Sequence, residues 1–580
     1  MFFLQIIKKL IPLLDEVFKK KVIKLLIAYI FIIFLEMFSV GSLVPLIVIF
    51  TDINLFLENE LSRELYFFLG SPDQTQLLKY SLIFIFFIFL IKTIFIFLWQ
   101  FSISKLSQDF NVYLSSNMLD KYMKLNLKNL KDINIAEIAR DVTREVDVVS
   151  NYCFKITIPL VCEAMLIILV FLSFFYINFT ATLTIFVLLI TSALLYVKIV
   201  SKSIVALSSE IQVSQLKQIQ TTNEIFNNIK IIKLYSKYSD QLMQFVGYAK
   251  TMASAKFKNE ILKNLPRLLF EFLSVSVCIF LILILLIQGK SVNTIFITLG
   301  LFAVVIFKLF PMTIKIIDYI QILKFLIPSL NIIENKTNSL KNIKNKAKNY
   351  EDQKISFESL QNISINKISF SYNEDKELFN KLDFHIKKNE CVGIIGASGT
   401  GKSTLIDLIM GFYEPSNGNI LINGININRY DKSWKNKIGY VPQHSYLFDS
   451  SIAQNIAFTY NKETIDYLKI NEVIKLAQLK NFVDNLPNKI HENIGENGTK
   501  LSSGQKQRIA IARCLYFQPK LIILDEATSN LDIDNEDNFF KSIENILNQN
   551  TTIIISHRKN SLKSCSKIFE LKNNQLIQVK

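Results

Sequence analysis

Residues 396–403 read Gly-Ala-Ser-Gly-Thr-Gly-Lys-Ser and match the G-x-x-x-x-G-K-[ST] pattern of a phosphate-binding loop. A β-type apolar run ends at Ile395 and a helical pattern begins at Thr404, which is the context that such a loop requires. Its glycines allow backbone N–H groups to turn toward phosphates, and the helix N-terminus adds its positive dipole end. We expect Lys402 to reach the β- and γ-phosphates and Ser403 to ligate Mg²⁺.

A second motif with acidic residues follows a buried strand pattern. Residues 521–526 read Leu-Ile-Ile-Leu-Asp-Glu, so the strand would deliver Asp525 to the metal, directly or through water. Glu526 could then polarise the attacking water as a general base. The two motifs together predict a site that binds ATP with Mg²⁺ and hydrolyses it. The nucleotide contacts expected from the loop are Gly396, Ser398, Gly399, Gly401, Lys402, Ser403 and Thr404.

Between these motifs, residues 501–505 read Leu-Ser-Ser-Gly-Gln, which resembles the LSGGQ signature of the ABC ATPase family. From Ile365 to the C-terminus the motifs of that family stand in its order: Walker A, Q-loop, signature, Walker B, D-loop and switch histidine. The resemblance is highly specific over this part of the chain. It implies an α/β P-loop nucleotide-binding domain, and the β-type runs that alternate there with helical patterns favour the same parallel-stranded layout.

The resemblance also implies a role for each matching residue. Gln443 would sense Mg²⁺ and the γ-phosphate, and His557 would contact the γ-phosphate. Tyr372 would stack on adenine, and Asp532 would be the aspartate of the D-loop. The catalytic residues so expected are Lys402, Gln443, Glu526 and His557, and the metal ligands are Ser403, Gln443 and Asp525.

The signature segment departs from the family at one position, because Ser503 stands where the family has its first glycine. A Cβ is thereby added where the backbone would approach the γ-phosphate. Ser502, Gly504 and Gln505 match, so we expect a working site. In this family the signature closes over the Walker A loop of the opposite domain. One ATPase domain per chain therefore implies a dimer of two identical chains.

The chain of 580 residues is too long for one hydrophobic core. Half of its residues are hydrophobic, 47 are Phe, and 20% are charged, a combination that places much of the chain in lipid. The net charge of +16 could indicate nucleic-acid binding. However, Lys and Arg gather beside the apolar runs, as expected of cytoplasmic loops, and no nucleic-acid partner is predicted.

Six apolar stretches are long enough to cross a bilayer as helices. Basic residues precede the first stretch and acidic residues follow it, so both chain ends are predicted to be cytoplasmic. The long charged segments 101–151 and 201–266 would be cytoplasmic arms, gripping the ATPase near 126–131 and 231–238. Helices buried in a large soluble protein are the disfavoured alternative. The predicted spans are 22–50, 80–99, 152–175, 180–200, 268–287 and 294–327.

The expected fold class is a multidomain membrane protein, with a six-helix transmembrane domain of the ABC exporter type and an α/β P-loop nucleotide-binding domain. The transmembrane domain would comprise residues 1–330. A Lys- and Asn-rich linker or helix end would follow over 331–353, and the nucleotide-binding domain over 354–580.

Ionisable residues within the spans are functional candidates, because each costs about 2.5–3.5 kcal/mol at a helix centre. Four basic residues lie in or beside three of the spans and would suit an anionic cargo such as a phosphate group. Snorkelling or ion pairing between helices is the alternative for each of them. The four basic residues are Lys92, Arg267, Lys308 and Lys315.

A narrower resemblance concerns the membrane half. The segments 34–38, 266–267 and 307–311, with Lys315, resemble the PglK-type flippases, which move lipid-linked oligosaccharides across the bacterial inner membrane. In that family basic residues at these places line the cavity near the lipid pyrophosphate, and the first outer loop carries a short helix. The segment 54–69 has a suitable helical pattern. Three of the four basic residues are Lys where that family tends to use Arg.

These features favour ATP-driven flipping of an undecaprenyl-pyrophosphate oligosaccharide by alternating access across a bacterial inner membrane. A multidrug or lipid A exporter with the same fold is a second hypothesis, and it would require an apolar cavity more than charge. An ATP-gated regulator that transports nothing is a third, which Glu526 and His557 argue against.

Overall fold

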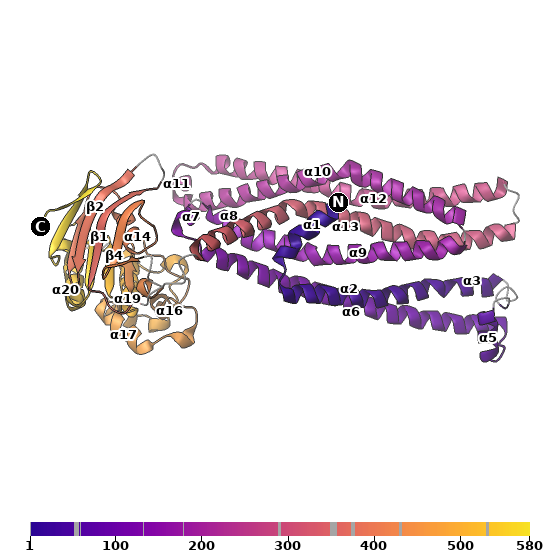
Figure 1. Cartoon of the computed structure of the whole chain (residues 1–580), viewed down its shortest axis with the longest axis horizontal. Helices are drawn as coiled ribbons and strands as arrows, with labels where there is room; N and C mark the ends of the chain where they lie inside the picture. Colours follow the sequence, from indigo (N-terminus) through magenta and orange to yellow (C-terminus); the bar gives the residue numbers. More distant parts are fainter. Residues whose placement is uncertain are drawn as a thin grey trace. The chain divides into compact units, whose positions relative to one another are not determined.

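The computed structural model describes residues 2–51, 57, 60–131, 133–177, 179–287, 292–348, 357–372, 377–427, 432–528, 533–558 and 560–580. These residues form two compact units, one helical and one built around β-sheets (Figure 1). The first unit contains Met1–Leu125 and Asp132–Ile343, and the second contains Asn126–Lys131 and Lys344–Lys580. The segment 126–131 thus belongs to the second unit.

Long helices dominate the first unit, and four of them have between 49 and 57 residues. At 1.5 Å per residue, a 50-residue helix is about 75 Å long, more than twice the thickness of the hydrocarbon core. The predicted cytoplasmic arms are therefore continuations of the same helices. The elements are α1 (Phe2–Leu10), α2 (Glu16–Gly41), α3 (Leu43–Thr51), α5 (Glu60–Phe68), α6 (Gln74–Met123), α8 (Ile135–Arg140), η2 (Asp141–Glu145), α9 (Val146–Ile177), α10 (Phe179–Asn227), α11 (Ile229–Leu234), α12 (Tyr238–Ile287) and α13 (Val292–Lys348).

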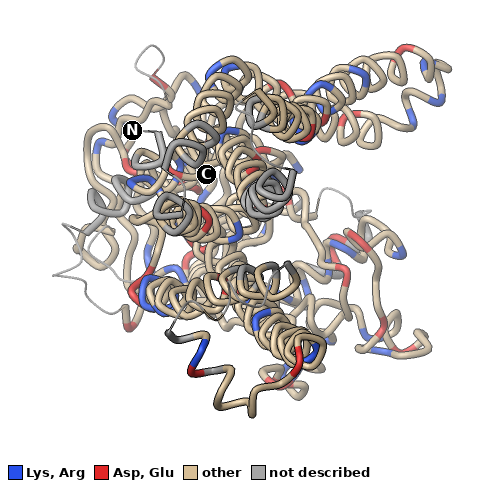
Figure 2. Tube along the Cα trace, turned by 90° about the vertical axis from the view of Figure 1, so that its right-hand side faces the viewer, with Lys and Arg blue, Asp and Glu red and all other residues tan. Residues whose placement is uncertain are grey.

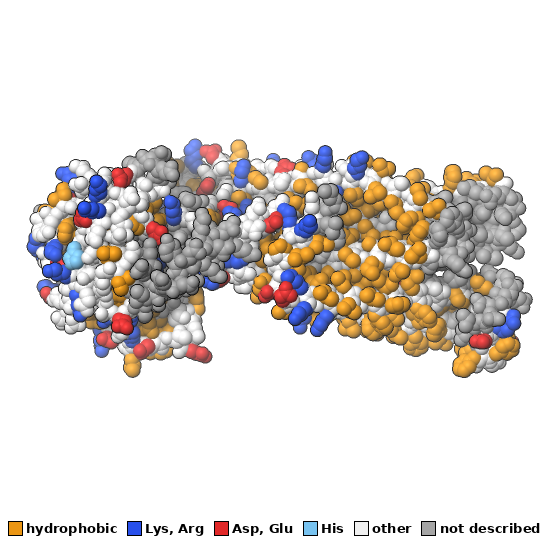
Figure 3. Space-filling view, in the orientation of Figure 1, with side chains coloured by type: hydrophobic (Ala, Val, Ile, Leu, Met, Phe, Trp, Pro, Cys, Tyr) orange, Lys and Arg blue, Asp and Glu red, His pale blue; other side chains and the backbone are white. Residues whose placement is uncertain are grey.

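Apolar side chains cover much of the face of the helical unit that Figure 3 shows. Figure 2, in which the long helices are seen end-on, shows Lys, Arg, Asp and Glu scattered along a trace on which other residues predominate. Phe34, Phe86 and Phe97 are each more than 60% exposed, which is the pattern of helices that face lipid rather than water. Among the described residues, five helices are long and apolar enough to span a membrane: Glu16–Ser39, Gln74–Met123, Ile135–Leu172, Phe186–Asn227 and Leu309–Ser339.

The predicted spans correspond to these helices with three differences. The first is broken between α2 and α3, where Gly41 lowers helix propensity and Pro45 lacks an N–H. The fifth, 268–287, lies in α12, follows the charged Arg267 and contains Glu271, and it is not one of the five helices. The first part of the sixth span, 294–308, is helical, but its side chains are outside the described ones. The predicted linker 331–353 continues α13 as far as Lys348, and residues 349–353 are outside the described residues.

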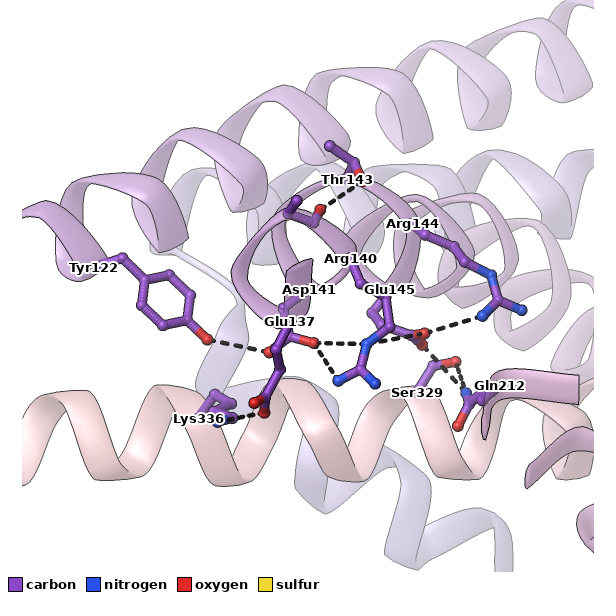
Figure 4. Close-up of polar contacts among 11 residues, drawn as sticks. Tyr122, Glu137, Arg140, Asp141, Thr143, Arg144, Glu145, Gln212, Ser329 and Lys336 are labelled. Atoms are coloured by element: carbon purple, nitrogen blue, oxygen red, sulfur yellow. Dashed lines mark hydrogen bonds and ion pairs between the residues drawn. The ribbon is translucent and has the colours of Figure 1, made fainter. Parts of the chain in front are cut away.

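A buried polar network joins five elements of the helical unit, α6, α8, η2, α10 and α13 (Figure 4). Asp141 and Glu145 are fully buried at the two ends of η2, which is a π-helix between α8 and α9. Asp141 accepts hydrogen bonds from Tyr122 of α6 at 3.1 Å and from Arg140 at 2.7 Å. Glu145 accepts one at 3.2 Å from Gln212 of α10, whose amide also lies 2.6 Å from Ser329 of α13. The network fixes the start of the α9 arm against α6, α10 and α13.

Two sheets form the second unit. In the six-stranded sheet, of order β10-β9-β3-β8-β7-β6, the five strands other than β10 run parallel, as predicted for this part of the chain. The other sheet is antiparallel, of order β2-β1-β4-β5. The strands are β1 (Asn362–Ser371), β2 (Glu377–Lys387), β3 (Cys391–Ile395), β4 (Asn417–Ile422), β5 (Ile425–Asn426), β6 (Ile438–Val441), β7 (Leu521–Asp525), β8 (Thr551–Ile555), β9 (Lys567–Lys572) and β10 (Gln575–Gln578).

Apolar clusters cover both faces of the parallel sheet, which explains why β7 and β8 are buried along their whole lengths. Ile522 and Leu524 of β7 point into one cluster, whereas Leu521 and Ile523 point into the other. The strand therefore delivers Asp525 from a rigid, buried element. The helices of this unit are α7 (Leu127–Lys131), α14 (Lys402–Ile409), α15 (Lys432–Lys435), α16 (Ile452–Ala457), α17 (Tyr467–Leu476), α18 (Lys480–Asp484), α19 (Ser503–Tyr516) and α20 (Ile533–Gln549).

Candidate nucleotide site and membrane cavities

The phosphate-binding loop lies between the end of β3 and the start of α14, where the sequence predicted it. Gly401, which precedes α14, has a φ of 103°, and a Cβ there would lie 3.0 Å from the Phe379 ring. A Cβ on Gly396 would lie 2.8 Å from the carbonyl oxygen of Leu571. A side chain at either glycine would therefore force its neighbours to move, and the loop backbone could not keep this turn.

Lys402 is buried inside this loop. Its ammonium donates hydrogen bonds to the carbonyl oxygens of Gly396 at 2.8 Å and Ala397 at 2.9 Å. Its Nζ also lies 3.4 Å from Nε2 of His557. Burial lowers the pKa of Lys402, and the nearby carboxylates of Glu526 and Asp525 oppose that effect. The cation is thus held at the place where the sequence predicts phosphate groups.

Asp525 collects two hydroxyl groups at the end of β7. Ser403 and Tyr440 each donate a hydrogen bond to Oδ2 of Asp525, both at 3.3 Å. Burial raises the pKa of Asp525, and these two hydrogen bonds oppose that effect. A hydroxyl and a carboxylate are oxygen ligands of the kind that Mg²⁺ prefers beside substrate phosphates, so Ser403 and Asp525 fit the predicted metal site.

Tyr440 is a candidate site residue that sequence reasoning missed. It lies in β6, three residues before Gln443, and its side chain is on the exposed side of the strand while Gly439 and Val441 are buried. Burial of the hydroxyl group and the charge of Asp525 raise the pKa of Tyr440, so it stays a protonated donor. One signal in the sequence could have found it. Tyr440 carries a hydroxyl group and alternates with buried residues in β6, the strand that pairs with β7, which ends at Asp525.

Three predicted catalytic residues meet at the carboxylate of Glu526. Gln443 donates a hydrogen bond from Nε2 to Oε2 at 2.8 Å, and Nε2 of His557 lies 3.2 Å from Oε1. The backbone of Glu526 has a φ of 49°, which is uncommon for a residue other than glycine, and its N–H is bonded to the Ile555 carbonyl. Strained conformations of this kind cluster at functional sites.

The other predicted nucleotide contacts that the structure describes lie in two places, one beside the start of α14 and one at the start of α19. The Tyr372 hydroxyl lies 2.8 Å from Oγ1 of Thr404, so these two residues are brought together. Ser502 and Gln505 form a reciprocal capping box at the start of α19. Ser503 is the first residue of that helix and has an ordinary helical backbone, so it fits there without strain. Asp532 lies outside the described residues.

The four predicted cargo residues are not brought together in the part of the helical unit that the structure describes. Lys92 is buried 3.3 Å from Oε2 of Glu36, between α2 and α6. Arg267 is exposed on α12, and the side chain of Lys308 is outside the described ones. Lys315 lies 2.9 Å from Oε1 of Glu163. Ion pairing between helices, the alternative from sequence, is what the structure shows for Lys92 and Lys315.

Two cavities of opposite chemistry lie in the helical unit. A polar cavity of about 560 Å³ is formed by α2, α6, α9 and α13, and its wall includes Lys315, Glu163, Glu36 and Lys155. Lys155 lies near the start of the predicted span 152–175 and was not among the predicted cargo residues. An apolar cavity of about 1160 Å³ lies among α2, α3, α5 and α6. The helix α5 falls within the segment 54–69, where a short helix was predicted.

Comparison with known proteins places both units in one family. The family described as "ABC transporter transmembrane region" matches residues 18–309, and the family described as "ABC transporter" matches residues 379–529. A structure of a bacterial Atm1-family ABC exporter with ATP bound has a similar fold. Its TM-score is 0.75 and its sequence identity 21%, over 97% of this chain and 95% of that one.

The share of each protein's length that the match covers differs among individual relatives. A putative export ATP-binding/permease protein of Rickettsia bellii is 26% identical over 86% of this chain and 85% of its own length. ABC transporter B family member 21 of Arabidopsis thaliana is 36% identical over 37% of this chain, and the match spans only 17% of that protein. An ATP-dependent lipid A-core flippase of Coxiella burnetii is 40% identical over 36% of each protein.

Proposed function

This chain belongs to the ABC transporter family, with an ABC ATPase domain and a helical transmembrane region in one polypeptide, and we propose that two copies form an ATP-driven lipid flippase. The proposed cargo is an undecaprenyl-pyrophosphate oligosaccharide, moved from the cytoplasmic to the outer face of a bacterial inner membrane. Five lysines precede the predicted span 22–50 and support a cytoplasmic N-terminus: Lys8, Lys9, Lys19, Lys20 and Lys21.

The carboxylate of Glu526 is the centre of the proposed hydrolysis. Its role is to accept a proton from the attacking water, while Gln443 and His557 keep it in place from its two oxygens. Lys402 places a positive charge beside the phosphates. Ser403 and Asp525, with Gln443 as the family implies, would hold Mg²⁺. When bound, Mg²⁺ neutralises the charge that develops during phosphoryl transfer.

The position of the signature supports the proposed dimer. The N-terminus of α19 is exposed at Ser502 and Ser503, so its N–H groups are available to an anion. The family resemblance implies that this anion is the γ-phosphate bound by the partner's Walker A loop. Each chain has one loop and one signature, and two chains would complete two sites. The proposed domain limits are 1–330 and 354–580, joined through 331–353.

The pair of cavities is the observation that carries the cargo assignment. A lipid-linked oligosaccharide combines a charged pyrophosphate with a long apolar chain. The helical unit offers two lysines beside two glutamates in one cavity and aromatic side chains in the other. Phe34, Phe38, Phe84 and Phe87 line the apolar cavity. A multidrug exporter would need the second kind of cavity but not the first.

Lipid A is a second candidate cargo, because relatives from Coxiella burnetii and Ralstonia nicotianae are named ATP-dependent lipid A-core flippases. It also bears phosphate groups and apolar chains. The two cargoes are separated by reconstituting the chain in proteoliposomes and measuring ATP-dependent flipping of each lipid. We expect the undecaprenyl-linked glycan to move and Glu526→Gln to stop it.

Neutralising Arg267, Lys308 and Lys315 together should abolish glycolipid flipping while ATP hydrolysis continues. Unchanged flipping would contradict the role of these charges and favour an apolar cargo. ATP hydrolysis by the wild-type chain with no movement of either lipid or of a neutral drug would instead support a regulator.

A further inference from the structure

The polar cavity contains a buried carboxylate, that of Glu163 of α9, of which only one oxygen has a hydrogen-bond partner in the described part of the chain. Its side chain is 10% exposed, whereas that of its partner Lys315 is 55% exposed. Oε1 of Glu163 accepts a hydrogen bond from Lys315 at 2.9 Å, and Oε2 has no hydrogen-bond partner among the described residues. A buried carboxylate that is only half satisfied is costly and calls for an explanation beyond packing.

The other charges of the cavity wall are paired differently. Glu36 is held by Lys92, which lies in the adjacent helix and is itself buried. Lys155, eight residues before Glu163 on α9, donates a hydrogen bond at 3.3 Å to the neutral amide oxygen of Asn151. The hydrogen-bond partner of Lys155 therefore carries no charge. Lys315 of α13, in contrast, is paired with an anion, Glu163 of α9.

We propose that Glu163 is an internal counter-ion: it occupies Lys315 until an anionic group of the phosphate type enters the cavity, and that group then binds Lys315 together with Lys155. The proposal rests on the proposed function for its source of phosphate. Because Lys315 is more than half exposed, its bond to Glu163 is screened and weak enough to exchange. A phosphate group offers several charged acceptors and so competes well for two ammonium groups.

The counter-ion also provides selectivity. A neutral cargo offers Lys315 no negative charge in exchange for that of Glu163, so it does not compete for this cation, whereas an anionic group does. A phosphate on a polyprenyl chain and a phosphate on lipid A share the chemistry that this exchange requires.

The test uses the full-length protein in lipid nanodiscs and measures the concentration of undecaprenyl pyrophosphate that half-maximally stimulates ATP hydrolysis. Glu163→Gln should lower this concentration about three- to fivefold, as expected for removing a partly exposed ion pair that competes with the ligand. Lys315→Gln should raise it. Phosphorylated lipid A in place of the polyprenyl lipid shows which source is preferred, and uncharged undecaprenol should give no response to Glu163→Gln.

A double variant keeps the test independent of folding. Lys315→Gln leaves Glu163 buried without its cation, whereas Glu163→Gln with Lys315→Gln removes both charges and should fold. In that double variant the gain from Glu163→Gln should disappear. The control is Glu334→Gln, which removes the anion of the Lys9–Glu334 pair elsewhere in the helical unit and should leave lipid stimulation unchanged. Weaker stimulation in Glu163→Gln, or a gain that persists without Lys315, would overturn the proposal.

A second measurement separates this proposal from the proposed function. If neither phosphorylated lipid stimulates the wild-type protein, calorimetry measures the binding of inorganic pyrophosphate while ADP fills the nucleotide sites. Tighter binding by Glu163→Gln than by wild type would support the counter-ion even though the glycolipid assignment had failed. Equal binding by the two proteins would refute it.

Discussion

The amide of Gln443 donates a hydrogen bond to Glu526 across 83 residues of sequence, with 2.8 Å between Nε2 and Oε2. His557 approaches the other carboxylate oxygen at 3.2 Å. The candidate base is therefore held from both sides, by the segment after β6 and by the segment after β8. Its position depends on the register of two strands that flank β7 in one sheet.

Replacing Glu526 by Gln should lower the rate of ATP hydrolysis about 10²- to 10⁴-fold, because the general base is lost while the shape of the site is kept. ATP binding should persist, and it can be measured by fluorescence with a labelled nucleotide. The matched control is Glu472→Gln, a change at an exposed glutamate of the same unit, which should hydrolyse ATP at the wild-type rate. Wild-type hydrolysis by Glu526→Gln would disprove the assignment.

Tyr440→Phe removes one of the two hydroxyl groups that bind Oδ2 of Asp525. If Asp525 is a metal ligand, losing a hydrogen bond that orients it should raise the Mg²⁺ concentration needed for half-maximal ATP hydrolysis by about tenfold. Hydrolysis at saturating Mg²⁺ should change much less. Tyr446→Phe serves as the control, because Tyr446 is an exposed tyrosine of the same unit. An unchanged Mg²⁺ requirement would show that Tyr440 does not act through the metal.

The raised pKa of Asp525 has a consequence for stability. In the pH range between its ordinary pKa and its raised pKa, the folded protein holds a proton that the unfolded chain has lost, so stability falls as pH rises through that range. Above the raised pKa the buried negative charge remains unfavourable. Asp525→Asn should therefore raise the Tm of the metal-free protein at neutral pH by about 2–4 °C.

The same Asp525→Asn variant should gain less stability than wild type when Mg²⁺ and ATP are added, since a metal ligand has been removed. Scanning calorimetry with and without both ligands measures the two effects. A lower Tm in the metal-free variant would mean that the burial of Asp525 is compensated more fully than its pKa indicates.

The network of Figure 4 contains a matched pair of glutamates that differ in burial. Glu145 is fully buried, and Glu145→Ala should reduce the free energy of unfolding by roughly 3–5 kcal/mol, because Arg144 and Gln212 lose a buried partner. Glu137 is about one-third exposed in its pair with Lys336, so Glu137→Ala should cost less than about 1 kcal/mol. Thermal unfolding in detergent compares the two variants, and equal losses would contradict the role of burial.

The sequence by itself determined the features that depend on neighbouring residues. The loop from Gly396 to Ser403 could be recognised because glycines, lysine and serine act together within eight positions. The strands β3, β7 and β8 could be predicted from apolar runs, because strands covered on both faces need apolar residues throughout. The long apolar helices could be predicted because a helix that crosses the bilayer needs about 20 apolar residues in a row.

Only the tertiary structure decided which distant side chains meet. Tyr440 reached Asp525 because β6 lies beside β7 and presents alternate residues on one face. In the membrane half, four basic residues were predicted to act together on an anionic cargo. The structure instead pairs Lys92 with Glu36, and Lys315 with Glu163, which is 152 residues away. A buried charge pairs with whatever opposite charge helix packing brings near, and the packing of helices is set by contacts that no local pattern records.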